Sequence, residues 1–222
     1  MLKKVIITSA ISIFAMPTAI GANLDIDNIK SIQQSINNGE IKPYLEVKPV
    51  NGESRTVRMY YATFCPYSQQ YLNFFKNLAL TGQEATHMQF EITPVLNQKD
   101  GMNYALAYAS VRRYYPNKIF QFVRASIVAR QNGGQDPSQW RDIDAIGKSI
   151  GIPERISMVI HKNKEVLAKD VLRLSVVQQD LKITNTPSIA VAGMYIATPE
   201  ITGGRGEDFS KLVNGLISMV NY

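Results

Sequence analysis

The chain contains a single cysteine, Cys65, at the point where a predicted strand meets a predicted helix. Residues 56–63 are rich in β-branched and aromatic side chains, which is typical of a strand. Beyond them apolar side chains recur at helical spacing, and Pro66 suits the first helical position because its missing N–H would have no partner there. Cys65 is then expected at the N-cap, where unpaired backbone N–H groups and the helix dipole favour thiolate over thiol. The pattern predicts a reactive cysteine.

A lone cysteine can also have a purely structural role, as a small buried apolar residue. One cysteine cannot form a disulfide within its own chain, so Cys65 is either inert or a functional thiol. The formal net charge of +6 over 222 residues is a small basic surplus, and the arginines are spread through predicted helices. Nucleic-acid binding is therefore not expected. His87 and His161 lie far apart without companion ligands, so neither a metal nor a cofactor is expected.

The first 22 residues have the pattern of a signal peptide. A cationic start, Met1–Lys4, is followed by an apolar run, Val5–Met16, and by the break and small residues of a cleavage site, Pro17–Ala22. The alternative is a membrane anchor, but a span needs about 20 apolar residues and this run is shorter. We expect cleavage after Ala22 and an exported mature protein without a membrane-spanning segment.

The segment before the cysteine is expected to hold a helix over 24–38 and a strand over 44–50. Asn51-Gly52 is a turn signal, which suggests that this strand pairs with the strand over 56–63 as a hairpin. The helix that begins at Pro66 is expected to reach about Leu80.

The rest of the chain changes character twice. A strand is expected over 88–96, with Pro94 indicating a sheet edge or the end of the strand. Helical patterns follow almost without interruption over 99–174. A strand pair over 188–197 and a final amphipathic helix over 209–220 complete the chain. This order predicts an α/β domain interrupted by an inserted helical domain.

Three features together resemble the thioredoxin superfamily: the turn Phe64–Pro66, the helical block, and Thr186-Pro187 before the last hairpin. The chain is more closely similar to the bacterial periplasmic DsbA-like disulfide oxidoreductases, and Lys182–Ser188 resembles their segment before a cis-proline. The resemblance implies an α/β protein, a thioredoxin fold with an inserted all-helical domain, located in the periplasm. The expected parts are a signal peptide (1–22), a thioredoxin-like domain (23–98 and 175–222) and a helical insertion (99–174).

The resemblance also assigns roles to individual residues. Cys65 would be the nucleophile and Pro187 the cis-proline beside it. Thr186 would offer its backbone to an extended substrate, as strand-pairing binding sites do. Pro66 and Tyr67 would complete the client-binding surface.

Three positions depart from the family pattern. Members that oxidise substrates have a second cysteine three positions after the first, and here that position is Ser68. A buried acid, frequent six positions before the nucleophile, is replaced by Met59. The histidine frequent in strong oxidants is replaced by Tyr67. Ser68 is counted as a catalytic residue because its hydroxyl is expected to donate a hydrogen bond to the Cys65 thiolate.

The missing cysteine limits the chemistry, because resolving a mixed disulfide within the protein requires a second sulfur. The sequence therefore predicts an exported thiol–disulfide exchange enzyme that forms mixed disulfides with cysteine-containing exported proteins. Release would come from a second client thiol, which is isomerisation, or from a small thiol or redox partner, which is reduction. One alternative is a redox-inactive DsbA-like chaperone or assembly factor that binds extended clients in the cis-proline groove. Another is a glutathione-using transferase or isomerase.

Overall fold

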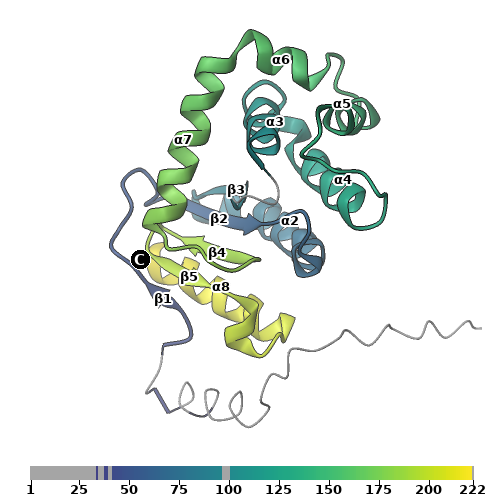
Figure 1. The fold of residues 1–222 in the computed structure, drawn as a ribbon. Helices are drawn as coiled ribbons and strands as arrows, with labels where there is room; N and C mark the ends of the chain where they lie inside the picture. Colours follow the sequence, from purple (N-terminus) through teal and green to yellow (C-terminus); the bar gives the residue numbers. More distant parts are fainter. Residues whose placement is uncertain (1–33, 35–37, 40–41, 97–100, 222) are drawn as a thin grey trace, which may run out of the picture.

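The computed structural model describes residues 34, 38–39, 42–96 and 101–221 (Figure 1). The predicted signal peptide lies outside these residues, and so does the predicted helix over 24–38 apart from residues 34 and 38. Within the described ranges, no helix combines the length and apolar character needed to cross a bilayer.

A five-stranded mixed sheet forms the centre of the fold, in the order β1-β5-β4-β2-β3. β2 pairs in parallel with β3 and antiparallel with β4, while β5 lies antiparallel to both β4 and β1. The strand bounds are β1 Leu45–Glu46, β2 Thr56–Tyr61, β3 Gln89–Pro94, β4 Ser188–Val191 and β5 Tyr195–Ala197.

The central strand β2 is buried along its whole length, which explains its nearly continuous apolar sequence. Val57, Met59 and Tyr61 belong to a core that also holds side chains of α2 (Pro66–Thr86) and α8 (Gly206–Asn221). Tyr60 belongs to a second, smaller core that includes Val177 near the end of α7 (Lys164–Asp180). Because successive strand side chains point to opposite faces, β2 is covered on both sides.

A helical block lies between β3 and β4 in sequence and forms one end of the molecule (Figure 1). Its hydroxyl groups reach the sheet: Tyr104 hydrogen-bonds Tyr61 at 2.7 Å between the two oxygens, and Tyr108 donates to the Ile92 carbonyl. The predicted thioredoxin fold with a helical insertion is confirmed. The block comprises α3 Gly101–Tyr114, η1 Pro116–Lys118, α4 Ile119–Gln131, α5 Trp140–Ser149, α6 Ile156–Lys162 and the first part of α7.

The predicted domain boundaries stay predictions. The last of them falls inside α7, which runs without a break from the helical block to the sheet. A short η2 (Pro199–Thr202) then connects β5 to α8.

The predicted hairpin between the strand over 44–50 and β2 is wrong. β1 is confined to Leu45–Glu46 and pairs with β5. The chain that follows β1 lies beside the β4–β5 turn, where the Val50 N–H donates a hydrogen bond to the Gly193 carbonyl at 3.0 Å. Both edges of β2 are already occupied, by β3 and β4. Asn51-Gly52 does form a turn, with Gly52 at φ +81°, but it redirects the chain without pairing the flanking strands.

The predicted end of the cysteine-bearing helix near Leu80 is also wrong, because α2 continues to Thr86. Gly82 lies within the helix, where a Cβ atom would come within 2.5 Å of the Phe90 ring. The glycine lets the helix lie close to the Phe90 ring of β3. His87 ends the helix in the left-handed region, at φ 54°.

Candidate functional site

Cys65 is the N-cap of α2, with an extended backbone at φ −84° and ψ 116°, and Pro66 begins the helix. The side chain is half-buried and forms no disulfide. The strand–turn–helix arrangement predicted around the cysteine is therefore present. The first turn of α2 contains no acidic side chain, so the positive end of the helix dipole is not offset there.

The opposing wall comes from a segment more than a hundred residues later in the chain. The Cys65 thiol donates a hydrogen bond to the Thr186 carbonyl, with 3.1 Å between Sγ and the oxygen. The peptide bond between Thr186 and Pro187 is cis. The structure thus brings together the cysteine and the Thr186-Pro187 pair that the sequence singled out.

Ser68 is fully buried directly below the cysteine loop. Its hydroxyl oxygen accepts a hydrogen bond from the Ala62 N–H at 3.2 Å, and its own N–H donates to the Cys65 carbonyl at 3.0 Å. Among the described residues, no hydrogen bond joins the Ser68 hydroxyl to the Cys65 sulfur. The contact on which its predicted catalytic role depended is absent here. Ser68 instead ties the end of the β2 segment to the first turn of α2.

Exposed aromatic side chains flank the cysteine. Tyr67 is 59% exposed and Phe64 is 37% exposed, and Pro66 is exposed as well. Thr186 is half-buried and Pro187 is buried. Exposed apolar surface beside a reactive atom is what a site for protein clients requires, since binding energy must come from groups next to the sulfur.

No family model and no curated protein matches the sequence. Solved structures do match. A serine-for-cysteine variant of Proteus mirabilis DsbA with a non-covalently bound peptide has a TM-score of 0.64 and 18% identity, covering 81% of this chain and 96% of that one. Reduced DsbA1 from Neisseria meningitidis has a TM-score of 0.65 and 15% identity, covering 80% of this chain and 91% of that one. Pseudomonas aeruginosa DsbA has a TM-score of 0.63 and 14% identity, covering 80% and 92%. This chain has the DsbA fold.

Within that DsbA fold, the helical block contributes a site residue that sequence reasoning missed. Gln131, the last residue of α4, donates hydrogen bonds from Nε2 to the carbonyls of Thr63 (2.9 Å) and Cys65 (3.0 Å). It therefore anchors the backbone on both sides of Phe64. Nothing in the local pattern of a glutamine at a helix end signals such a contact.

We expect Gln131→Ala to lower the free energy of unfolding by about 1–2 kcal/mol, because two part-buried carbonyls lose their donor. It should also slow exchange of Cys65 with a peptide disulfide several-fold, because the loop that positions the sulfur loosens. Chemical denaturation and stopped-flow exchange measure the two effects. Gln121→Ala, an exposed glutamine on the same helix, is the control. Equal effects of both substitutions would contradict the role of Gln131.

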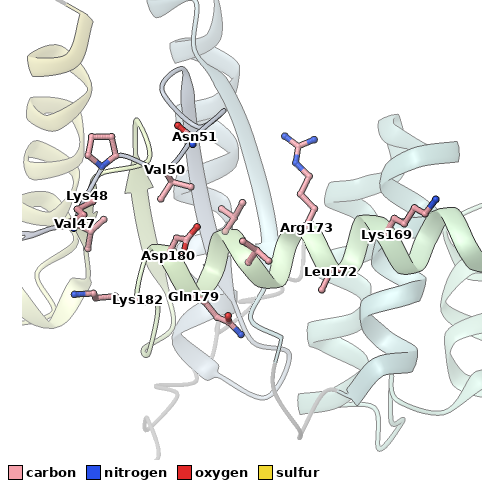
Figure 2. A pocket seen from close by; sticks show the side chains of 13 residues that line it. Val47, Lys48, Val50, Asn51, Lys169, Leu172, Arg173, Gln179, Asp180 and Lys182 are labelled. Carbon is pink, nitrogen blue, oxygen red and sulfur yellow. The ribbon is translucent and has the colours of Figure 1, made fainter.

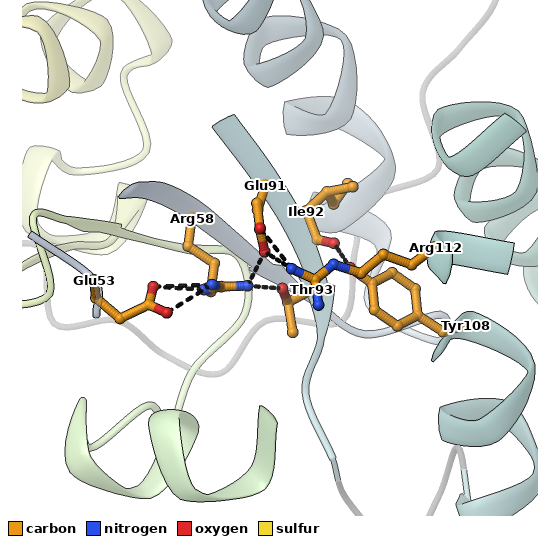
Figure 3. Close-up of polar contacts among 7 residues, drawn as sticks. All are labelled: Glu53, Arg58, Glu91, Ile92, Thr93, Tyr108 and Arg112. Atoms are coloured by element: carbon orange, nitrogen blue, oxygen red, sulfur yellow. Dashed lines mark hydrogen bonds and ion pairs between the residues drawn. The ribbon is translucent and has the colours of Figure 1, made fainter. Parts of the chain in front are cut away.

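Met59, where DsbA-like proteins frequently carry a buried acid, is fully buried among apolar side chains. Buried charge lies on the opposite face of β2, around Arg58 (Figure 3). Arg58 pairs with Glu53 at 2.9 Å and with Glu91 at 2.5 Å, and it donates to the Thr93 hydroxyl at 2.8 Å. No pattern in the sequence had indicated this cluster.

Glu91 also pairs with Arg112 of α3, at 2.5 Å, so the cluster joins the sheet to the helical block. Burial alone raises the pKa of Glu91, but Arg58 and Arg112 outweigh burial and hold that pKa below its ordinary value. The cluster is thus a structural link between the two parts of the DsbA fold, and its Glu91 is ionised at neutral pH.

Both histidines are exposed. His87 lies at the C-terminal end of α2, and His161 lies on α6. In the described ranges, no three histidine, cysteine, aspartate or glutamate side chains gather as metal ligands would.

Proposed function

We propose that this protein is an exported, periplasmic thiol–disulfide exchange enzyme that works through Cys65 alone and forms mixed disulfides with cysteine-containing client proteins. The observation that carries the proposal is the Cys65 thiol at the start of α2, hydrogen-bonded to the Thr186 carbonyl beside the cis-proline. The DsbA fold supports it at a coarser level, because the structural neighbours are named as disulfide oxidoreductases or interchange proteins.

The exchange step needs only the residues present. The Cys65 thiolate attacks one sulfur of a client disulfide, the new bond joins Cys65 to that sulfur, and the other client sulfur leaves as a thiolate. A second client thiol, or a small external thiol, then attacks the mixed disulfide and releases Cys65. The first route leaves the client isomerised. The second leaves the client sulfur bonded to the small thiol, and a second small thiol must then attack that bond to give the reduced client and the disulfide of the two small thiols. The electrons therefore balance without a second cysteine in this chain.

The Thr186 carbonyl connects client binding to this step. In the thiol form it accepts the Cys65 S–H. A thiolate has no proton to donate, so the carbonyl becomes available to the N–H of an extended client strand when the nucleophile forms. Client recognition would then rest on backbone pairing at Thr186, with Pro66 and Tyr67 contacting the client's side chains. One of the similar DsbA structures was solved with a bound peptide, which is consistent with such a groove.

The decisive experiment compares acid-quenched cell extracts. The natural protein should yield adducts of client mass that a reductant dissolves, and Cys65→Ala should yield none. Tyr67→Ala, which keeps the sulfur, should yield the same adducts at reduced amount because an exposed contact residue is lost. If the natural protein forms no adduct, or an adduct with glutathione alone, the client-exchange proposal is wrong.

The exposed aromatic side chains beside Cys65 favour a second candidate, a redox-inactive chaperone or assembly factor that uses the same groove. This candidate predicts the opposite pattern of variants. Cys65→Ala would keep protection of an unfolded client against aggregation, whereas Tyr67→Ala would lose it. A light-scattering assay with both variants distinguishes the two functions.

A further inference from the structure

A groove of about 910 Å³ lies between α7 and the chain that follows β1 (Figure 2). One wall is the α7 surface from Lys169 to Asp180, and the other is the segment from Val47 to Asn51. Neither Cys65 nor Thr186 lines it. The groove is therefore separate from the thiol site, and the proposed exchange chemistry leaves it without a role.

The α7 wall presents apolar side chains to solvent. Leu172 is 66% exposed and Val176 is 48% exposed, and their spacing of four residues places them on one stripe of the helix. Val47 and Val50 line the facing wall, where both are largely buried. The concave surface thus has an apolar strip along its length, which is typical of surfaces that bind a partner.

The charges around this strip are mostly positive. The cations that line the groove are Lys48, Lys169, Arg173 and Lys182, and Asp180 is the one carboxylate among the lining residues. In the described part of the chain, none of these four cations makes an ion pair, although other basic residues do, such as Arg113 with Asp170 on α7 at 2.7 Å. Four unpaired cations around an apolar strip favour an occupant that carries carboxylates beside apolar side chains.

We propose that this groove docks an acidic amphipathic polypeptide segment of a partner protein. Its apolar side chains contact Leu172 and Val176, and its aspartates and glutamates meet the four cations at the rim. The α7 wall from Lys169 to Asp180 extends about 16 Å at 1.5 Å per residue, which matches about three turns of helix. A concave groove with a raised second wall suits a polypeptide segment better than the flat surface of a membrane.

The test uses a fluorescent amphipathic helical peptide with leucines on one face and glutamates on the other. A second peptide has the same sequence with lysine in place of every glutamate. We expect the acidic peptide to bind and the basic one not to bind. Replacing one lysine on each wall, Lys48→Glu with Lys169→Glu, should weaken binding by at least about tenfold, because attraction becomes repulsion. Leu172→Ser with Val176→Ser should also weaken binding. All four substituted positions are exposed, so both pairs of substitutions are expected to leave the fold intact.

The matched control is Lys76→Glu with Lys164→Glu, two exposed lysines outside the groove that alter net charge by the same amount. It should leave peptide affinity within about twofold of the natural protein. Cys65→Ala should bind normally, since the groove does not involve the thiol. Equal weakening by the control pair, or binding of neither peptide, would overturn the proposal. Binding of phosphatidylglycerol vesicles that only the groove pair abolishes, with no peptide binding, would also overturn it and assign the surface to membranes.

Discussion

Under the proposed function, Ser68→Cys is expected to convert the protein from a single-thiol exchanger into one that resolves its own mixed disulfides. Ser68 lies three residues after Cys65 in the first turn of α2, so a sulfur there is on the same side of the helix. The new thiolate attacks the Cys65–client bond, forms the 65–68 disulfide and expels the client as a thiol. Because this attack is intramolecular, release of a client adduct should accelerate by at least about a hundredfold. Acid-quenched gel shifts measure the adduct lifetime.

The control for this gain is Gln70→Cys, which adds a thiol at an exposed position in the next part of α2. A second sulfur that points elsewhere should leave the adduct lifetime unchanged. If both cysteine variants release clients equally fast, release does not depend on the position of the second thiol, and the prediction for position 68 is wrong. Loss of the Ala62 contact is the expected side effect of Ser68→Cys, at about 1 kcal/mol in the free energy of unfolding.

Arg58→Met is expected to be among the most damaging single substitutions, lowering the free energy of unfolding by about 3–5 kcal/mol. Arg58 is 4% exposed and Glu53 is 3% exposed, so removing the guanidinium leaves a carboxylate buried without a counter-charge. Chemical denaturation measures the loss. Adding Glu53→Gln should recover part of it, because the uncompensated charge is then gone. A loss below about 1 kcal/mol would show that the buried pair contributes little.

The pH dependence of stability gives a second check on the same cluster. A carboxyl with a lowered folded-state pKa, such as Glu91, stabilises the fold above its unfolded-state pKa, and this contribution is lost as the pH falls through the folded-state value. In Arg58→Met, Glu91 keeps only Arg112 as a counter-charge, so the pKa of Glu91 is lowered less. The loss of stability as the pH falls below about 4.5, the ordinary pKa of a glutamate, should therefore be smaller than in the natural protein.

Local signals were sufficient for the half of the site that lies at the start of α2. Pro66 suits the first helical position, and the β-branched and aromatic residues before Cys65 predict a strand. The cysteine's place at the N-cap therefore follows from its neighbours in sequence. The hydrogen bond from Cys65 to Thr186 spans 121 residues. The resemblance to DsbA-like proteins predicted that the cis-proline segment lies beside the cysteine, but it did not predict this hydrogen bond, and no local pattern indicates it.

Contacts that depend on how distant elements pack could not be predicted from the sequence. The hydrogen bond from Ala62 to the Ser68 hydroxyl depends on how the buried first turn of α2 packs, which the local sequence does not specify. Gln131 reaches the cysteine loop only because α4 packs beside α2. The Asn51-Gly52 signal correctly marked a turn but could not tell which strand would occupy the edge of β2. Gly82 suggested a helix end. Its role in the structure, which is to make room for the Phe90 ring, depends on a tertiary contact that the local sequence does not show.

The outermost strands of the sheet offer little to a passing chain. β1 has only two residues, and β3 ends at Pro94, whose nitrogen has no hydrogen to donate. Long regular sheet edges template aggregation, and short strands and prolines are the usual protection against it. A protein with the proposed function, which binds extended and partly unfolded clients, would meet complementary strands continually. Its blunt edges would keep those clients from adding to the sheet and from seeding fibrils, and would leave the backbone at Thr186 as the place where an extended chain can pair.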